Sequence, residues 1–269
     1  MAYPLARLCV AALLAAVLVN AQVVFSRRSY TERGRTWHQL WMWNQEDGKM
    51  KPLTHSSRNH FAPSCAVGRG LIYFYTGDES DYDRQIWAFN RATGAEHPAI
   101  AKPAAKEEQK VPIVGCENSA WTTDRTRGAC AVGQNVLFYD AAQGTITGRV
   151  RFDQRPTPPD VLGWSANGEW LLVSTMGAKD NSTSRQSDFF LLSAADRQWK
   201  FAGSGNSAFW VPGRNELIYS SPRDLTPLGK GKRHGVWTAQ LEIFDPATGK
   251  HTSITKGKTY NIQPAPCVK

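Results

Sequence analysis

The residues that could do chemistry are scattered along this chain and form no recognisable local motif. No two of its six histidines stand at the spacing by which one element holds a metal ion, and the six are His38, His55, His60, His97, His234 and His251. A Gly-x-Ser-x-Gly turn for a nucleophilic serine is absent as well. Local motifs therefore predict no catalytic residue, no metal site and no cofactor.

Chemistry could still arise where distant segments converge. A glycoside-cleaving enzyme needs carboxylates from different segments about 5–10 Å apart, and Glu117, Asp124 and Asp160 are the candidates. A metal held by His60 and His234 is a further alternative. Which side chains can meet depends on the elements that carry them.

Those elements repeat along the chain. Five segments share alternating apolar residues, then Asn, Asp or Ser, then a turn: LWMWNQEDGK (40–49), IWAFNRATGA (86–95), VLFYDAAQGT (136–145), FFLLSAADRQ (189–198) and LEIFDPATGK (241–250). The polar anchors are 46 to 53 residues apart, at Asn44, Asn90, Asp140, Ser193 and Asp245. Four residues later comes Gly48, Gly94, Gly144 or Gly249, but Arg197 in the fourth copy. The anchor caps the strand end and glycine accepts the positive φ that closes the turn.

A second hairpin precedes each of the later copies. SCAVGRGLIYFYT (64–76), WSANGEWLLVST (164–175) and FWVPGRNELIYSS (209–221) match one another, and WTTDRTRGACAVG (121–133) is a degenerate version. With the short strand after each copy, one unit is four antiparallel strands in about 50 residues, the pattern of a β-propeller blade. We predict an all-β propeller of five blades, with six as the alternative, at 262–269 with 22–54, 60–101, 118–151, 160–202 and 207–256.

The two ends of the chain complete each other. NIQPAPCVK (261–269) resembles HFAPSCAVG (60–68), an innermost strand, and VVFS (23–26) resembles LIYFY (71–75), a second strand. We therefore expect the terminal strands to share one blade and to close the ring, which removes open sheet edges. Residues 22–269 are then a single domain.

WSANGEWLLVST resembles the W-S-P-D-G-x-x-I-x-F-x-S core of the TolB-type propeller repeat, which is similar to the WD repeat. QLWMWNQEDGKMKPLT (39–54) resembles the second half of that repeat, and the likeness covers nearly all of residues 22–269. The chain departs from TolB in lacking room for its N-terminal domain and in having five predicted blades instead of six. The resemblance implies a bacterial periplasmic or secreted protein with a binding role.

Propellers bind ligands over the central channel, where the innermost strands begin. Seven polar residues just ahead of those strands are candidates for a ligand-binding or partner-binding rim on this channel face: Asn59, His60, Glu117, Asn118, Asp160, Asn206 and Asn261. The alternative is that they only cap turns. Trp121, Trp164 and Trp210 stand at matching repeat positions, which favours packing between blades.

Four cysteines follow residue 21, and three pairings of them are open. Cys65 and Cys267 stand at equivalent points of adjacent innermost strands, so we favour a disulfide between them that locks the closed ring, and a second between Cys116 and Cys130. Unpaired cysteines filling tryptophan positions are the alternative.

Residues 1–21 have the form of a secretory signal peptide cut after Ala21, with Arg7, the apolar run VAALLAAVLV (10–19) and the small-residue end VNA (19–21). An uncleaved anchor is the alternative. No second spanning run follows, so we predict a periplasmic or secreted protein without a transmembrane segment after cleavage. Beyond residue 21 the chain has 31 Lys and Arg against 23 Asp and Glu, scattered along it. We expect a monomer that binds a protein or peptide partner in the cell envelope and no nucleic acid, with a carbohydrate-binding or glycan-cleaving propeller as the alternative.

Overall fold

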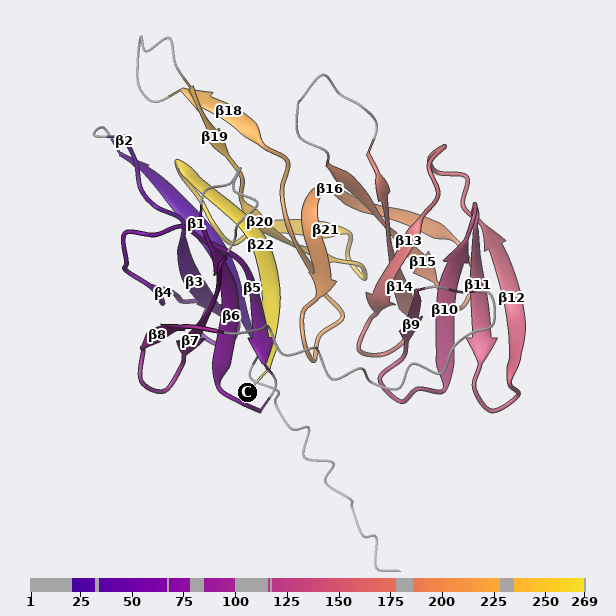
Figure 1. The fold of residues 1–269 in the computed structure, drawn as a ribbon. Coiled ribbons are helices and arrows are strands. Elements are labelled where there is room, and N and C mark those ends of the chain that lie inside the picture. Colours follow the sequence, from indigo (N-terminus) through magenta and orange to yellow (C-terminus); the bar gives the residue numbers. More distant parts are fainter. Residues whose placement is uncertain are drawn as a thin grey trace, which may run out of the picture.

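The computed structural model describes residues 21–31, 34–66, 68–77, 85–99, 116, 118–177, 186–227 and 235–268. Every regular element within these ranges is a β-strand (Figure 1). No helix in the described ranges could cross a membrane. The predicted signal peptide, except for Ala21, lies outside the described residues, as do Glu117 and His234, so the structure does not test them.

The first blade joins the two ends of the described chain. β22 (Thr259–Val268) pairs with β1 (Ala21–Thr31), followed outward by β3 (Gln39–Asn44) and β4 (Met50–Pro52), and all the pairs are antiparallel. The pairing of β1 with β22 runs from Ala21 opposite Val268 to Ser29 opposite Thr259. The expected sharing of one blade by the terminal strands is therefore observed. The short β2 (Gly34–Arg35) pairs back onto the far end of β1.

The remaining strands follow in chain order, each unit starting from its innermost strand. Blade 2 has β5 (His60–Ala66), β6 (Leu71–Thr76), β7 (Gln85–Asn90) and β8 (Glu96–Pro98). Blade 3 has β9 (Ser119–Trp121), β10 (Arg127–Val132), β11 (Asn135–Asp140) and β12 (Thr145–Arg151). This succession of four-stranded antiparallel sheets is the architecture of a β-propeller.

Blades 4 and 5 are joined in one seven-stranded sheet. Blade 4 has β13 (Asp160–Trp164), β14 (Trp170–Met176), β15 (Ser187–Ser193) and the first half of β16 (Trp199–Trp210). The second half of β16 is the innermost strand of blade 5, beside β17 (Leu217–Ser220), β20 (Leu241–Asp245) and β21 (Lys250–Ser253). The repeat predicts that one blade ends at residue 202 and the next begins at residue 207. This boundary is wrong, because β16 runs through it as one continuous strand.

Glycine makes that continuity feasible. Gly203 and Gly205 have φ of 139° and 152°, in the region that side-chain-bearing residues avoid. A Cβ at Gly205 would overlap the backbone carbonyl oxygen of Ser220. The chain crosses from one sheet to the next at this close approach.

Blade 5 carries an insertion that the repeat did not predict. β18 (Asp224–Pro227) and β19 (Gly235–Thr238) form a hairpin between β17 and β20, and this hairpin projects from the body of the molecule beside the end of β2 (Figure 1).

The repeated turn has the predicted chemistry. Gly48, Gly94, Gly144 and Gly249 have φ of 67–73°, and Arg197 takes the same conformation at 62°. The anchor side chains accept turn N–H groups, as in Asp140 Oδ1 with Gln143 at 2.9 Å and Asp245 Oδ1 with Ala247 at 2.9 Å. The prediction from the anchor spacing is confirmed in all five copies, including the one without glycine.

Buried side chains fill the joints between neighbouring blades. Val23 and Phe25 of blade 1 pack with Ile218 and Leu241 of blade 5, and equivalent clusters join blades 1 and 2, 3 and 4, and 4 and 5. The tryptophans lock two joints, because Trp164 Nε1 donates to the Ala120 carbonyl and Trp210 Nε1 to that of Gly163, at 3.1 and 3.0 Å. This supports the packing role expected for Trp164 and Trp210, whereas the Trp121 indole bonds within its own strand to Ser119.

The joint between blades 2 and 3 differs. None of the hydrophobic clusters within the described ranges contains residues of both blades, and the cluster of Cys130 and Leu137 packs only with blade 3 side chains and Cys116. The described strands form five blade units, but closure of a five-membered ring at this joint stays a prediction.

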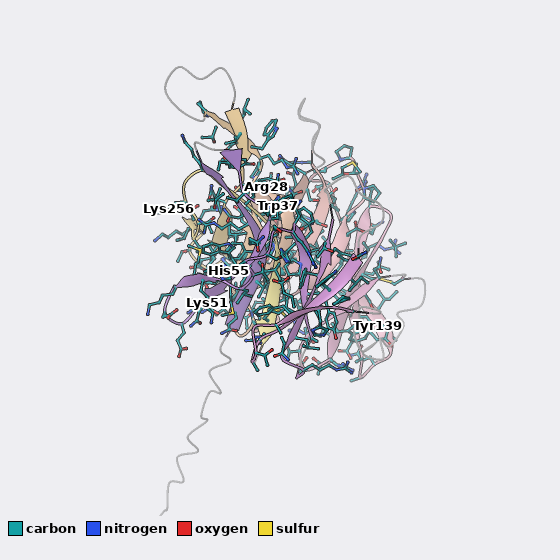
Figure 2. The ribbon with its side chains drawn as sticks, turned by 60° about the vertical axis from the view of Figure 1, so that its left-hand side comes forward. Arg28, Trp37, Lys51, His55, Tyr139 and Lys256 are labelled. Carbon is teal, nitrogen blue, oxygen red and sulfur yellow. A yellow bond between two sulfur atoms is a disulfide. The ribbon has the colours of Figure 1, made fainter. Side chains whose placement is uncertain are left out.

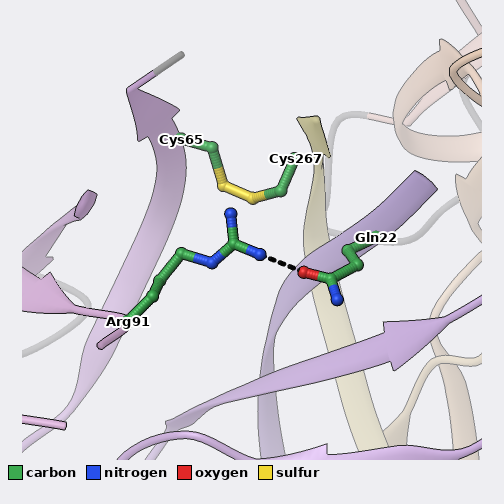
Figure 3. The surroundings of a disulfide bond; sticks show 4 residues. All are labelled: Gln22, Cys65, Arg91 and Cys267. Atoms are coloured by element: carbon green, nitrogen blue, oxygen red, sulfur yellow. Dashed lines mark hydrogen bonds between the residues drawn. A yellow bond between two sulfur atoms is a disulfide. The ribbon is translucent and has the colours of Figure 1, made fainter. Parts of the chain in front are cut away.

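Two disulfides are present, and they are the pairs favoured from the sequence. Cys65 and Cys267 join the innermost strands of blades 2 and 1, and Cys116 bonds to Cys130. Beside the first of them, the Arg91 guanidinium donates to the Gln22 side-chain oxygen, again linking blade 2 to blade 1 (Figure 3).

Candidate functional site

All blades expose the same end, which we call the upper face. It is the end at which innermost strands begin and second strands connect to third strands. Thr76, for example, is opposite both His60 at the start of β5 and Gln85 at the start of β7. The predicted rim residues that the structure describes and the β18–β19 hairpin therefore lie at one end of the molecule, the upper end in Figure 1.

Asn59 and His60 are buried at the joint of blades 1 and 2. Asn59 Oδ1 accepts from the His38 N–H at 2.9 Å, and His60 Nδ1 lies 3.0 Å from the His38 carbonyl oxygen. His60 Nε2 lies 3.1 Å from Glu96 Oε2 and 3.3 Å from Ser56 Oγ. These side chains hold two blades together, which is closer to the turn-capping alternative than to a ligand rim.

The group of Ser56, His60 and Glu96 does not have the geometry of a catalytic triad. In a triad the acid bonds to one ring nitrogen and the serine to the other. Here both oxygens share Nε2, and Nδ1 faces a backbone carbonyl. The arrangement ties β8 to β5 and leaves no ring nitrogen free to activate Ser56.

Asn261 occupies the corresponding place between blades 5 and 1. It is fully buried, and its amide nitrogen donates to the Ala239 carbonyl at 2.9 Å and to Thr259 Oγ1 at 2.8 Å. Its backbone carbonyl accepts from Ser220 at 2.6 Å, just as that of His60 accepts from Ser26 at 2.6 Å. Asn261 is thus also part of a joint.

The other rim candidates lie nearer to solvent. Asn118 and Asp160 are exposed and Asn206 is half-buried, at the starts of the innermost strands of blades 3, 4 and 5. Glu117 lies outside the described residues. Asp124 sits at the lower end in the turn between β9 and β10, so the structure does not bring it together with Asp160.

That turn shapes the acidity of Asp124. Its carboxylate accepts hydrogen bonds from Thr122 Oγ1 at 2.6 Å and from the backbone N–H and hydroxyl of Thr126 at 3.1 and 2.9 Å. These hydrogen bonds, that of Thr122 foremost, lower the pKa of Asp124 to about 2. The group is a structural acceptor and not a proton donor. Within the described ranges no three His, Cys, Asp or Glu side chains form a metal-binding group.

Sequence reasoning missed a second set of joint residues. Gln39 Oε1 accepts from Thr54 Oγ1 at 2.9 Å, and Gln240 Oε1 accepts from Thr255 Oγ1 at 2.8 Å. Each threonine hydroxyl also accepts the N–H of the residue that follows the glutamine. The signal was in the repeat, because Gln-Leu begins and Thr ends both 39–54 and 240–255.

The innermost strands bulge where they line the channel. One or two extra residues stand opposite the second strand at Ala62, Leu162, Ser207 and Gln263. Ala62, Ser207 and Gln263 have positive φ of 46–53°, and Gln263 Oε1 accepts from the Ala62 N–H at 2.7 Å. Bulges of this kind re-aim side chains and are common near binding sites.

A groove of about 340 Å³ crosses the top of blade 1. Its lining includes Trp41, over which the Arg27 guanidinium lies at 4.4 Å from the ring centroid, and the half-exposed Trp37. Burial lowers the pKa of Arg27. Further lining residues are Ser29, Thr36, Gln39, Pro52, Thr54, His55 and Ser56. Figure 2 shows Trp37 near Arg28, below the projecting β18–β19 hairpin.

The upper face also gathers exposed apolar side chains. Six of the eight large apolar side chains exposed in the described ranges lie at this end or in the channel: Trp37, Val132, Leu162, Met176, Leu225 and Trp237. Leu225 and Trp237 are cross-strand partners on β18–β19, with 61% and 44% of their surface exposed. Ile146 and Phe201 are the other two, on outer strands.

Comparisons with known proteins find similarity to solved structures alone. No family model matches, and no curated protein matches. The chain is similar to the solved structure of TolB from Acinetobacter baumannii, with 10% identity, 91% of this chain and 66% of that chain covered, and a TM-score of 0.39. It thus spans slightly less than two thirds of that structure.

A second likeness is to a proposed 6-phosphogluconolactonase from Bacteroides fragilis, with 13% identity, 92% of this chain and 97% of that chain covered, and a TM-score of 0.44. The corresponding protein of Bacteroides uniformis has 11% identity, coverage of 93% and 99%, and a TM-score of 0.45. At such identities and scores, none of these likenesses carries a function to this chain.

Proposed function

We propose that this chain is an exported β-propeller binding module whose upper face holds a segment of a protein or peptide partner in the bacterial cell envelope. The observation that carries the proposal is the gathering of exposed apolar side chains on that face. Adjacent exposed apolar side chains on a folded domain mark interaction sites, and Leu225 and Trp237 form such a pair on the projecting hairpin. Aromatic side chains dominate the energy of such contacts.

The projecting β18–β19 hairpin extends the upper face beyond the body of the molecule. Leu225 and Trp237 stand side by side on β18–β19, which projects beyond the body of blade 5 next to β2, and Trp37 follows β2 in the chain by two residues. A partner segment lying across the upper face would contact both. The two disulfides suit an oxidising compartment, which supports export to the periplasm or the medium.

Site-specific photo-crosslinking tests this function. A photoreactive phenylalanine is placed at Trp37 or Trp237 and, as control, at the equally exposed Ile146, in the full chain of residues 1–269 expressed in the source cell. We expect one protein to be crosslinked from both upper positions and not from Ile146. The same products from all three positions, or none from the upper face, would contradict the proposal.

A glycan ligand is the second candidate, because the groove of blade 1 has an exposed aromatic side chain beside polar lining. Trp37 offers a stacking surface, and Gln39, Thr54 and His55 offer hydrogen-bonding groups. Envelope polysaccharides that protect the Trp37 fluorescence from quenching, or that are cleaved, would favour this candidate. A Trp37→Ala variant that binds them as well as the native chain would contradict it.

A further inference from the structure

Arg28 is a buried charge without a counter-ion. Its side chain is on β1, and the residue is only 6% exposed. Its one hydrogen bond runs from Nη2 to Asn59 Oδ1 at 3.5 Å, and that oxygen is already occupied by the His38 N–H at 2.9 Å. Its Nε is buried and makes no hydrogen bond. No carboxylate in the described ranges forms an ion pair with it.

The same fold shows how a satisfied arginine is built. In blade 4 the Arg155 Nε donates to Asp188 Oδ2 at 2.6 Å, and Ser204 donates to the other carboxylate oxygen at 2.6 Å. Asp188 is buried, so the pair is complete without any ligand. Burying a guanidinium without such a partner is costly. Arg28 is therefore placed like the cation of an ion pair whose anion is missing from the described residues.

A second arginine lies beside the first. Arg28 is directly opposite Tyr260 in the pairing of β1 with β22, which brings the two side chains to the same face of the sheet. The Arg223 guanidinium, from the segment that leads into β18, lies 4.8 Å from the centroid of the Tyr260 ring. Its Nε is also buried without a hydrogen bond. Two arginines thus neighbour one tyrosine near the upper face.

The terminal nitrogens of the two guanidinium groups differ from their Nε atoms. The fully buried, unbonded atoms of Arg28 and Arg223 are the two Nε atoms alone. Nη1 of Arg28 and both terminal nitrogens of Arg223 make no hydrogen bond to the described residues and are not among the fully buried unbonded atoms. An anion that binds these atoms would approach from the upper face, between the groove of blade 1 and the β18–β19 hairpin.

We propose that Arg28 and Arg223, which both neighbour Tyr260, form an anion-binding site, and that its ligand is a carboxylate of the partner segment. The inference rests on the proposed function, and it names the chemistry that the partner must present. A guanidinium fork matches the two oxygens of a carboxylate. The carboxylate is a glutamate or aspartate side chain or a free C-terminus, and Leu225, Trp237 and Trp37 would contact the residues around it.

Calorimetric titration at low chloride concentration tests the site with four probes. Three are N-acetylated hexapeptides with one sequence of leucine and alanine around a central position: Glu with an amidated end, Gln with an amidated end, and Gln with a free carboxylate. The fourth is inorganic phosphate. We expect each carboxylate peptide to bind at least about tenfold more tightly than the neutral one, and the tighter of the two identifies the source of the carboxylate.

Variants assign the effect to the two arginines. Arg28→Met and Arg223→Met should each weaken binding of the carboxylate peptides by about tenfold to a hundredfold and leave the neutral peptide unaffected. The control Arg149→Gln removes the same charge from an exposed position on β12 and should change affinity less than about twofold. Arg223 is only half-buried, so its variant tests the site even if Arg28→Met disturbs the fold.

The possible results distinguish a failure of the proposed anion site from a failure of the proposed binding function. Equal binding of all three peptides, or unchanged peptide binding by both arginine variants, would contradict the anion site. The proposed binding function would still hold in that case if the crosslinks from Trp37 and Trp237 are observed. Phosphate that binds more tightly than either carboxylate peptide overturns the carboxylate assignment. A second expected result is independent of any ligand: Arg28→Met should unfold at the same temperature as the native chain or higher in chloride buffer, because it removes an unpaired buried charge.

Discussion

The two disulfides should differ in what they contribute, and the difference follows from loop length. Cys65 and Cys267 are 202 residues apart, whereas Cys116 and Cys130 are 14 apart. If a disulfide acts by restricting the unfolded chain, the long loop contributes about 5 kcal/mol and the short one about 3 kcal/mol. Removing the first should therefore cost about 2 kcal/mol more, or roughly 4–8 °C in the unfolding temperature of a domain of this size.

The pairs are well matched for this comparison. Each has one fully buried cysteine, Cys267 or Cys130, and one partly buried cysteine, Cys65 or Cys116. Replacing either pair by alanine removes similar packing, so packing losses largely cancel in the difference. The assay is urea unfolding of Cys65→Ala/Cys267→Ala and Cys116→Ala/Cys130→Ala, followed by tryptophan fluorescence. Equal losses, or a larger loss for the short loop, would refute the chain-entropy reasoning.

Three further outcomes are expected. Gly205→Ala should destabilise the fold by about 3 kcal/mol or more in urea unfolding, because its Cβ would overlap the Ser220 carbonyl oxygen; a loss under 1 kcal/mol would show that β16 can shift. Arg197→Gly should change the free energy of unfolding by less than about 1 kcal/mol, because relief of the positive φ offsets the lost stacking of Arg197 on Phe138. Arg197→Ala keeps the backbone strain and also loses the stacking, so it should be the less stable of the two variants in urea unfolding. The hydrogen bonds of Asp124 lower its pKa to about 2, so their contribution to stability is complete above about pH 4 and is lost as the pH falls toward 2. Asp124→Asn should remove that part of the pH dependence of stability. A carboxyl NMR titration of Asp124 with a midpoint near pH 4 would contradict this expectation.

What the sequence could predict was local or repeated. The anchors and glycines of the third-strand turns lie within a few residues of each other, so their spacing indicated the turn, the strand order and the unit length. The likeness of 261–269 to 60–68 predicted the pairing of β1 with β22 and placed Cys267 beside Cys65. Each of these predictions comes from comparing one segment of the chain with another segment of the same chain.

What it could not predict depends on contacts between segments that do not repeat. Asn59, His60 and Asn261 have the residue types of a binding rim, but His38, Glu96, Ala239 and Thr259 occupy them in the folded chain. The β18–β19 hairpin interrupts the repeat and so had no second copy to reveal it. Arg28 looks like an ordinary surface charge in the alternating sequence of β1, and only its burial without a carboxylate singles it out.

The strand shared by blades 4 and 5 gives the propeller an uneven stiffness. The Cys65–Cys267 disulfide ties blade 1 to blade 2, and packed side chains fill the other shared joints, but among the described strands β16 alone continues from one sheet into the next. A force or a tilt applied to the β18–β19 hairpin enters blade 5 and passes to blade 4 along covalent bonds. These two blades should therefore turn as one body, and relative motion within the molecule should concentrate at the joint between blades 2 and 3, which lacks a shared cluster of buried side chains in the described ranges.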